Sequence, residues 1–219
     1  MADNVSKEAQ DILQNSARHI NCLSDENKNV RKRALQGLQK DTLIDVSEPR
    51  VLQLVFNEIS KPLLKVVSDP VEKCRELAIS YLTTAIQKIQ NIQGFLPYII
   101  PVFVQRLGQQ EIIEPSEELR LDLVVALSVI IECSQKEMAS YLDDVIKILQ
   151  RTIVDPYPDL RKESCKCACK IAKAIPEHFH QQSESLIKPL TESISHQHSR
   201  VRVEVIMAIG KRLSILCYC

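Results

Sequence analysis

One short pattern recurs along the chain and constrains its fold more than any other feature. It consists of an acidic residue, an apolar–arginine pair six positions later, and apolar or small residues three and seven positions beyond the arginine. The arginines are Arg31, Arg75, Arg120, Arg161 and Arg202, which follow one another at intervals of 44, 45, 41 and 41 residues. The positions six residues before them hold Asp25, Asp69, Glu114, Asp155 and His196. Intervals of about 40–47 residues are typical of HEAT and armadillo repeats, in which each unit is a helical hairpin.

The residues around each arginine predict where the second helix of a hairpin begins. A proline directly follows the acidic residue in three copies, as Pro70, Pro115 and Pro156. We therefore expect the acidic residue to cap the helix and the proline to lie in its first turn. In the second copy, apolar residues between Cys74 and Ile89 follow the i, i+3, i+4, i+7 spacing of an amphipathic helix. A lone hairpin cannot bury its apolar faces, so neighbouring copies must stack.

The predicted fold class is therefore all-α, an α-solenoid (armadillo-like superhelix) of about five HEAT-type hairpins without β-strands. We expect one continuous solenoid domain with repeats over residues 5–40, 50–91, 95–134, 137–175 and 177–219. The residues seven positions after four of the arginines are expected to be buried, namely Leu82, Leu127, Ala168 and Ile209. The longer turn from Gln109 to Ser116 is interpreted as a tolerated surface insertion in preference to a protruding contact loop, because loop insertions cost little.

Charge and hydropathy exclude several classes of function. Lys plus Arg and Asp plus Glu both number 28, so the chain lacks the basic excess of a general nucleic-acid binder. The segment Met1–Gln10 is polar and no apolar run is long enough to span a membrane, so we expect a reducing compartment and no membrane contact. In that reducing compartment the 8 cysteines are expected to be free thiols.

The sequence has no convincing catalytic or metal-binding motif. The chain has no Gly-rich phosphate loop, no Gly-x-Ser-x-Gly elbow and no His-Glu-x-x-His, so we expect no enzyme activity, catalytic residue or cofactor. Side chains that could ligate a metal cluster at Cys165, Cys167, Cys169, His178, His180, His196 and His198. On a helix, however, Cys167 points about 200° away from Cys165. Because these thiols cannot converge and the pair His196 and His198 has no third ligand nearby in sequence, we expect no metal site.

The recurring arginines and acidic residues have two interpretations. They could form a ligand-binding ladder, or they could hold the fold together, with the acid capping its turn and the arginine pairing with its own or a neighbouring acid. The structural interpretation is preferred, because a specific binding site would mark one repeat and not every copy. The partner-binding residues remain unassigned.

The last third of the chain resembles a known family. The stretch Arg161–Val205 is similar to HEAT-repeat dynein axonemal assembly factors, most specifically at Pro176–His180, Gln182–Ile187 and Ile194–His198. Weaker similarity extends back over about two thirds of the chain. The resemblance implies a non-catalytic scaffold for cytoplasmic preassembly of the outer and inner axonemal dynein arms of motile cilia. It also implies axonemal dynein intermediate and heavy chains, other assembly factors and chaperones as partners.

The alternative function is that of a generic HEAT-repeat adaptor, such as a tubulin-binding array or a transport or phosphatase scaffold. Tubulin-binding arrays usually carry Trp and Lys at their turns, and this chain has no Trp. Family members are longer, and Leu213–Cys219 does not resemble their continuation, so we expect a truncated or alternative end. The last helix is apolar over more than one face, which predicts an exposed patch there, possible self-association, and accessible thiols at Cys217 and Cys219.

Overall fold

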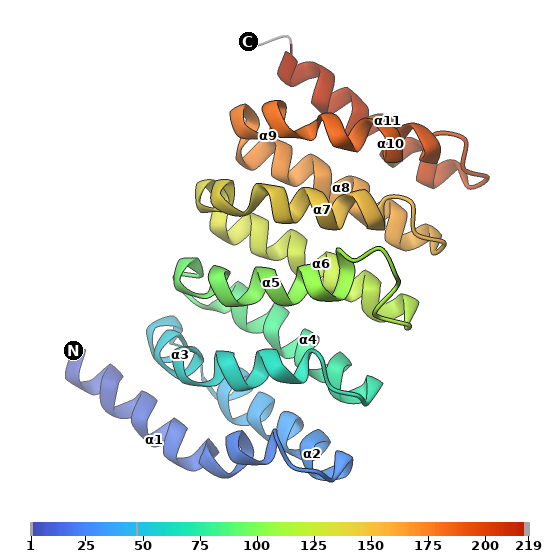
Figure 1. Ribbon diagram of the computed structural model, residues 1–219. Coiled ribbons are helices and arrows are strands. Elements are labelled where there is room, and N and C mark those ends of the chain that lie inside the picture. Colours follow the sequence, from blue (N-terminus) through green and yellow to red (C-terminus); the bar gives the residue numbers. More distant parts are fainter. Residues whose placement is uncertain (1, 47, 217–219) are drawn as a thin grey trace. The chain divides into compact units, whose positions relative to one another are not determined.

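The computed structural model describes the backbone of residues 2–46 and 48–216, and the side-chain surroundings of residues 4–46 and 48–210. Over these residues the regular elements are all helices, without a strand, and they pair into hairpins (Figure 1). The predicted all-α solenoid is confirmed. The described helices include none with the length and apolarity that a membrane span requires. The chain divides into two compact units, Met1–Tyr98 and Ile99–Cys219.

The first unit is built from two neighbouring hairpins in its described residues. Its elements are α1 (Ala2–Cys22), α2 (Lys28–Gln39), the π-helix η1 (Lys40–Ile44), α3 (Pro49–Val66), α4 (Glu72–Lys88) and the 3-10 helix η2 (Gln93–Phe95). Helix α1 packs on α3, and α2 packs on α4. First helices of adjacent hairpins therefore lie side by side, as do second helices.

Side chains of α4 hold the π-helix that follows α2. The hydroxyl groups of Tyr81 and Thr42 lie 2.5 Å apart in a buried hydrogen bond. Lys88 donates to the carbonyl oxygen of Leu43 at 2.6 Å. Burial raises the pKa of Tyr81, which keeps its hydroxyl available as a neutral hydrogen-bonding group.

The second unit contains the remaining hairpins. Its elements are α5 (Leu96–Leu107, which begins in the first unit), α6 (Glu117–Ser134), the 3-10 helix η3 (Gln135–Tyr141), α7 (Leu142–Thr152), α8 (Pro158–Ala174), α9 (Pro176–Gln182), the 3-10 helix η4 (Ser183–Leu186), α10 (Ile187–Ser193) and α11 (Ser199–Leu216). The first helix of the last hairpin is thus broken into three pieces. Pro189 contributes to the break, because it has no N–H to donate back to the carbonyl of residue 185.

Of the four residues that were predicted to be buried seven positions after an arginine, three are buried. Leu82, Leu127 and Ala168 are buried, whereas Ile209 is only half-buried. The prediction for Ile209 was wrong because α11 packs on α8, α9 and α10, and no described helix covers its other side. Cys217 and Cys219, whose thiols were predicted to be accessible, lie outside the described residues.

The predicted helix starts were displaced. The second helices were expected to begin with an acidic cap and a proline in the first turn, but α4, α6 and α8 have Val71, Ser116 and Tyr157 as their N-cap residues. The prolines after the acidic residues therefore lie in the turn itself, before the helix. The reason is that each acidic side chain accepts a backbone N–H within the turn, two residues further along.

Candidate functional site

The turns at the recurring register share one side-chain hydrogen bond. In each, the side chain six residues before the arginine accepts a hydrogen bond from the backbone N–H of the residue two positions after it. Where this residue is aspartate, the arrangement is an Asx-turn. The pairs are Asp25 with Asn27 (2.8 Å), Asp69 with Val71 (2.7 Å), Glu114 with Ser116 (3.2 Å), Asp155 with Tyr157 (2.9 Å) and His196 with His198 (3.2 Å). The acidic side chain thus binds the N–H of the residue that precedes or caps the helix, and the imidazole of His196 makes the same bond.

Each arginine closes its own turn from the helix that follows. Nη1 of Arg31, Arg75, Arg120 and Arg202 donates to the carbonyl oxygen six residues back, at 2.7, 2.8, 3.0 and 2.7 Å. In Arg161 the donor to that carbonyl is Nε, at 2.5 Å. These bonds satisfy carbonyl groups at which the chain reverses direction, so the arginine and the acidic residue fix the two sides of one turn.

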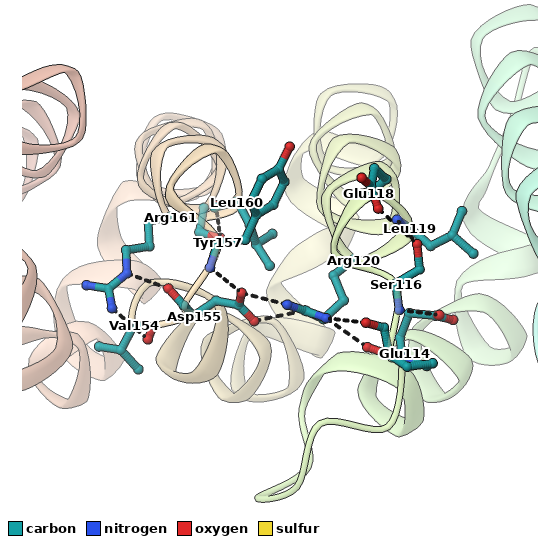
Figure 2. Close-up of polar contacts among 12 residues, drawn as sticks. Glu114, Ser116, Glu118, Leu119, Arg120, Val154, Asp155, Tyr157, Leu160 and Arg161 are labelled. Atoms are coloured by element: carbon teal, nitrogen blue, oxygen red, sulfur yellow. Dashed lines mark hydrogen bonds and ion pairs between the residues drawn. The ribbon is translucent and has the colours of Figure 1, made fainter. Parts of the chain in front are cut away.

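Within each unit, one guanidinium also reaches the turn of the next hairpin. Arg31 donates from Nε and Nη2 to the two carboxylate oxygens of Asp69, at 2.6 and 2.9 Å. Arg120 makes the same bidentate contact with Asp155, at 2.9 Å for both bonds (Figure 2). Both pairs are buried. Charge-assisted bidentate bonds are strong and directional, so they set the register of adjacent hairpins. They also neutralise each other's charge, which leaves neither group poised to bind a charged ligand.

The contact between the last two repeats is different. Arg161 lies at the equivalent position, but the next turn carries His196 in place of a carboxylate. Its Nη1 donates instead to the hydroxyl of Ser193 at 3.3 Å, and that hydroxyl donates to the carbonyl of Ile153 at 2.8 Å. Burial, and then the nearby Arg161, His198 and Arg202, lower the pKa of His196. A neutral imidazole is what the turn requires, because Nδ1 must accept the N–H of His198.

The cysteines near the end of the second unit are packing residues. Cys165 and Cys167 are buried in α8, and burial raises the pKa of each thiol to about 12. A thiol with so high a pKa is a poor nucleophile and a poor metal ligand at neutral pH. Across the described residues, no three His, Cys, Asp or Glu side chains are grouped closely enough to hold a metal ion.

Exposed apolar side chains lie outside the turns that the arginines and acidic residues hold. In the second unit, the long turn after α5 exposes two neighbouring isoleucines, with 57% of Ile112 and 41% of Ile113 accessible to solvent. The base of this turn is fixed, because the fully buried Glu114 pairs with Arg106. Between the turn and the end of α7 lies a cleft of about 170 Å³, whose lining includes Gln109, Ile112 and Arg151. An anchored loop with exposed apolar side chains beside a polar cleft is suited to protein contact.

The first unit has a second such surface. The ammonium group of Lys61 lies 4.7 Å from the centre of the exposed Tyr98 ring. A cleft of about 340 Å³ adjoins this pair, with amide side chains of Gln53, Asn57 and Asn91 in its lining. An exposed aromatic ring with amides and one cation is typical of a polar protein interface.

Comparison with known proteins identifies relatives. The sequence profile of a family described as "Dynein axonemal assembly factor 5-like, TPR repeats" matches residues 22–215. Dynein axonemal assembly factor 5 of Xenopus laevis is 51% identical over 209 residues, which are 95% of this chain and 25% of that protein. The proteins of the same name from Mus musculus and Homo sapiens are 37% and 36% identical, each over 93% of this chain and 25% of their own length. The chain thus spans about a quarter of the length of these relatives.

Solved structures share the fold. A designed armadillo repeat protein in complex with the peptide (KR)4 superposes with a TM-score of 0.68 at 18% identity, over 96% of this chain and 90% of that one. A computationally designed armadillo repeat protein for modular peptide recognition gives 0.66 at 18% identity, over 88% and 80%. At this level of identity the likeness establishes the armadillo-like architecture alone.

Proposed function

Because the chain belongs to the dynein axonemal assembly factor 5-like family, we propose that it is a non-catalytic scaffold for the assembly of axonemal dynein arms. The observation that carries the proposal is the 51% identity to a dynein axonemal assembly factor over 95% of the chain. The fold is compatible with such a role, because stacked helical hairpins present an extended surface for protein binding.

The proposed partners are axonemal dynein intermediate and heavy chains, together with other assembly factors or chaperones. The proposed place of action is the cytoplasm of cells with motile cilia, before outer and inner arms are mounted on the axoneme. Two buried ion pairs connect neighbouring hairpins, Arg31 with Asp69 and Arg120 with Asp155. Because these groups bind each other, they are not free to bind a partner. We therefore propose that partners bind the exposed side chains and not the recurring arginines and acidic residues.

Within the second unit, the exposed pair Ile112 and Ile113 is the proposed client contact. These side chains are held by a turn whose base is buried at Glu114, so they cannot fold back into the core without breaking its pair with Arg106. Apolar side chains fixed on the surface lose little conformational freedom on binding, which favours affinity.

The proposal is tested in multiciliated cells that lack the endogenous relative. Tagged forms of this chain, either unchanged or with Ile112→Ser and Ile113→Ser, would be purified from cytoplasmic extract and the bound proteins identified by mass spectrometry. We expect axonemal dynein chains with the unchanged chain and a loss of most of them with the double variant. A matched control is Ile44→Ser, which alters an isoleucine that is 72% exposed in the first unit.

Two results would contradict the proposal at different levels. If no axonemal dynein chain is recovered, and cells lacking the relative assemble normal arms, then the assembly role is wrong. If dynein chains are recovered equally with the double variant and the unchanged chain, then the role stands and the Ile112–Ile113 contact is wrong.

A further inference from the structure

A cleft in the first unit lies where α3 meets the segment that follows α4. Gln53, Asn57 and Lys61 are four residues apart, so one face of α3 presents all three to the cleft. Asn91 and Tyr98 line it from the segment after α4 and from the start of α5. The volume is about 340 Å³, which is the size of a small ligand pocket. Further hairpins precede and follow these elements in the chain, so the cleft is an internal feature of the array.

Two backbone N–H groups determine how the amide side chains of the cleft are oriented. The N–H of Asn91 donates to Oε1 of Gln53 at 2.9 Å, and the N–H of Gln93 donates to Oδ1 of Asn91 at 2.7 Å. Because a backbone N–H can only donate, each must meet an amide oxygen and not an amide nitrogen. Nε2 of Gln53 is then the donor to Oδ1 of Asn57, at 3.4 Å. All three side-chain oxygens thus accept bonds from within the chain, whereas the NH2 groups of Asn57 and Asn91 have no acceptor within residues 4–46 and 48–210.

The cleft carries positive charge without a balancing carboxylate. Nζ of Lys61 lies 4.7 Å from the centre of the Tyr98 ring, a cation–π contact that holds the ammonium group at the cleft. No aspartate or glutamate is among the described residues that line the cleft, and Lys61 makes no ion pair in the described part of the chain. One ammonium and two NH2 groups therefore offer hydrogen bonds at a place that supplies no charged acceptor. A carboxylate, which is negative and accepts through two oxygens, fits this set of donors.

We propose that this cleft binds an acidic segment of a partner protein. A carboxylate of the segment accepts from Lys61 and Asn57, and the NH2 group of Asn91 donates to a second oxygen of the same segment. The ring of Tyr98, which is 48% exposed, packs on an apolar part of the segment. A protein segment fits better than nucleic acid, because sites for phosphate backbones gather several cations and this cleft has a single lysine. The cleft belongs to the first unit and the exposed isoleucine pair to the second, so the proposal does not rest on that contact or on the assembly role.

Fluorescence anisotropy with labelled peptides tests the proposal on the purified chain. The acidic probe contains aspartate and glutamate residues around one leucine, and the neutral probe replaces each acid by its amide. We expect saturable binding of the acidic probe. The neutral probe should bind at least about tenfold more weakly, because the bonds from Lys61 and Asn57 no longer reach a charged acceptor. A labelled single-stranded oligouridylate tests phosphate recognition, and it should bind more weakly than the acidic probe.

Substitutions in the cleft show whether its donors bind the peptide. In Asn91→Asp the carboxylate can still accept the N–H of Gln93, but the NH2 donor is replaced by a negative oxygen, so the affinity for the acidic probe should fall about tenfold or more. Asn29→Asp, at an exposed asparagine of α2, makes the same change of charge and should bind like the wild type. Lys61→Gln should weaken binding about tenfold, whereas Lys65→Gln, at an exposed lysine one turn further along α3, should not. Circular dichroism shows whether each variant is folded.

Four results would overturn the proposal. One is an acidic probe that fails to bind at the highest concentrations reached. Another is equal affinity for the acidic and the neutral probe, which would mean that the carboxylates are not recognised. The third is an unchanged affinity of folded Lys61→Gln or Asn91→Asp, which would place the peptide elsewhere on the chain. The fourth is tighter binding of the oligouridylate than of the acidic probe, which would indicate a nucleic-acid site.

Discussion

At the scale of single residues, the chain depends on polar groups that are buried and paired. Arg120 closes its own turn and binds Asp155, and Asp155 in turn accepts the N–H of Tyr157. Each group thus serves two contacts, so that a substitution removes more than one. A buried ion pair stabilises little relative to apolar residues of the same size, but breaking it leaves an uncompensated charge. The first prediction at this scale follows from that asymmetry.

The first concerns Asp155→Asn. The amide oxygen can still accept the N–H of Tyr157, but the charge that balances Arg120 is lost. We expect the free energy of unfolding to fall by about 3 kcal/mol, measured by urea denaturation. Asp143→Asn, on an exposed aspartate of α7, should change it by less than about 0.5 kcal/mol. Equal effects of the two substitutions would show that the pair with Arg120 is not important for stability.

The second concerns pH and His196. Its pKa is lowered in the folded chain from an ordinary value of 6.5, so the unfolded chain binds more protons just below that pH. The stability due to the neutral imidazole is therefore present above about pH 6.5 and is lost as pH falls through the folded-state pKa. His196→Asp should remove this acid-sensitive contribution and offer Arg161 the carboxylate that other repeats provide. Thermal unfolding at pH 5 and pH 8 measures both effects, and a variant less stable than the wild type at pH 8 would contradict the second.

At the scale of secondary-structure elements, close packing between helices depends on small residues at particular positions. In the first unit, His19 of α1 lies over Gly37 of α2, and its Nε2 is 3.5 Å from a carboxylate oxygen of Asp41 in η1. A Cβ atom added at Gly37 would come within 2.5 Å of the imidazole ring. Glycine at this position therefore lets the imidazole lie where it does, although the helix itself would be more stable with alanine.

Gly37→Ala should accordingly destabilise the first unit. The ring of His19 must move and give up its contact with Asp41, so we expect a loss of about 1–2 kcal/mol in chemical denaturation. Gly94→Ala is the control, because nothing lies within 4 Å of a Cβ atom built there. Adding His19→Ala to Gly37→Ala should relieve the clash. If the double variant is no more stable than Gly37→Ala, the clash with His19 is not the cause.

At the scale of the whole molecule, stability in a repeat protein arises from each hairpin and its contacts with the next. Leu82 is completely buried in α4, a helix that packs on α2 and α3. The two hairpins of the first unit contact each other through α1 on α3 and α2 on α4. A charge placed inside one hairpin should therefore affect the adjacent hairpin as well.

Leu82→Asp tests this expectation. Burying an unpaired carboxylate costs several kcal/mol, which exceeds what one hairpin and its contacts can offset. We expect hydrogen exchange to show loss of amide protection throughout α1 to α4, and not in α4 alone. Leu54→Asp, at an exposed leucine of α3, should leave protection in these helices intact. Loss of protection confined to α4 would mean that the hairpins of the first unit fold independently.

The amino-acid sequence by itself determined the helical repeat, because both the recurrence of Arg31 to Arg202 and the amphipathic spacing are local in the chain. It also identified the turn residues six positions before each arginine, since a turn that reverses the chain needs a side chain to satisfy its backbone N–H groups. It could not show that each acidic side chain accepts the backbone N–H of the residue two positions after it. The helix starts of α4, α6 and α8 were therefore predicted two residues too early.

Only the tertiary structure decided which carboxylate each guanidinium meets and which apolar residues stay exposed. Arg31 and Asp69 are 38 residues apart, so their contact depends on how one hairpin packs against the next. Ile206 and Cys165 each stand four residues after a recurring arginine, yet one is exposed and the other buried, because burial depends on whether another helix lies against that face. A pattern in the sequence marks a face as able to stack, whereas the fold determines whether anything is stacked on it.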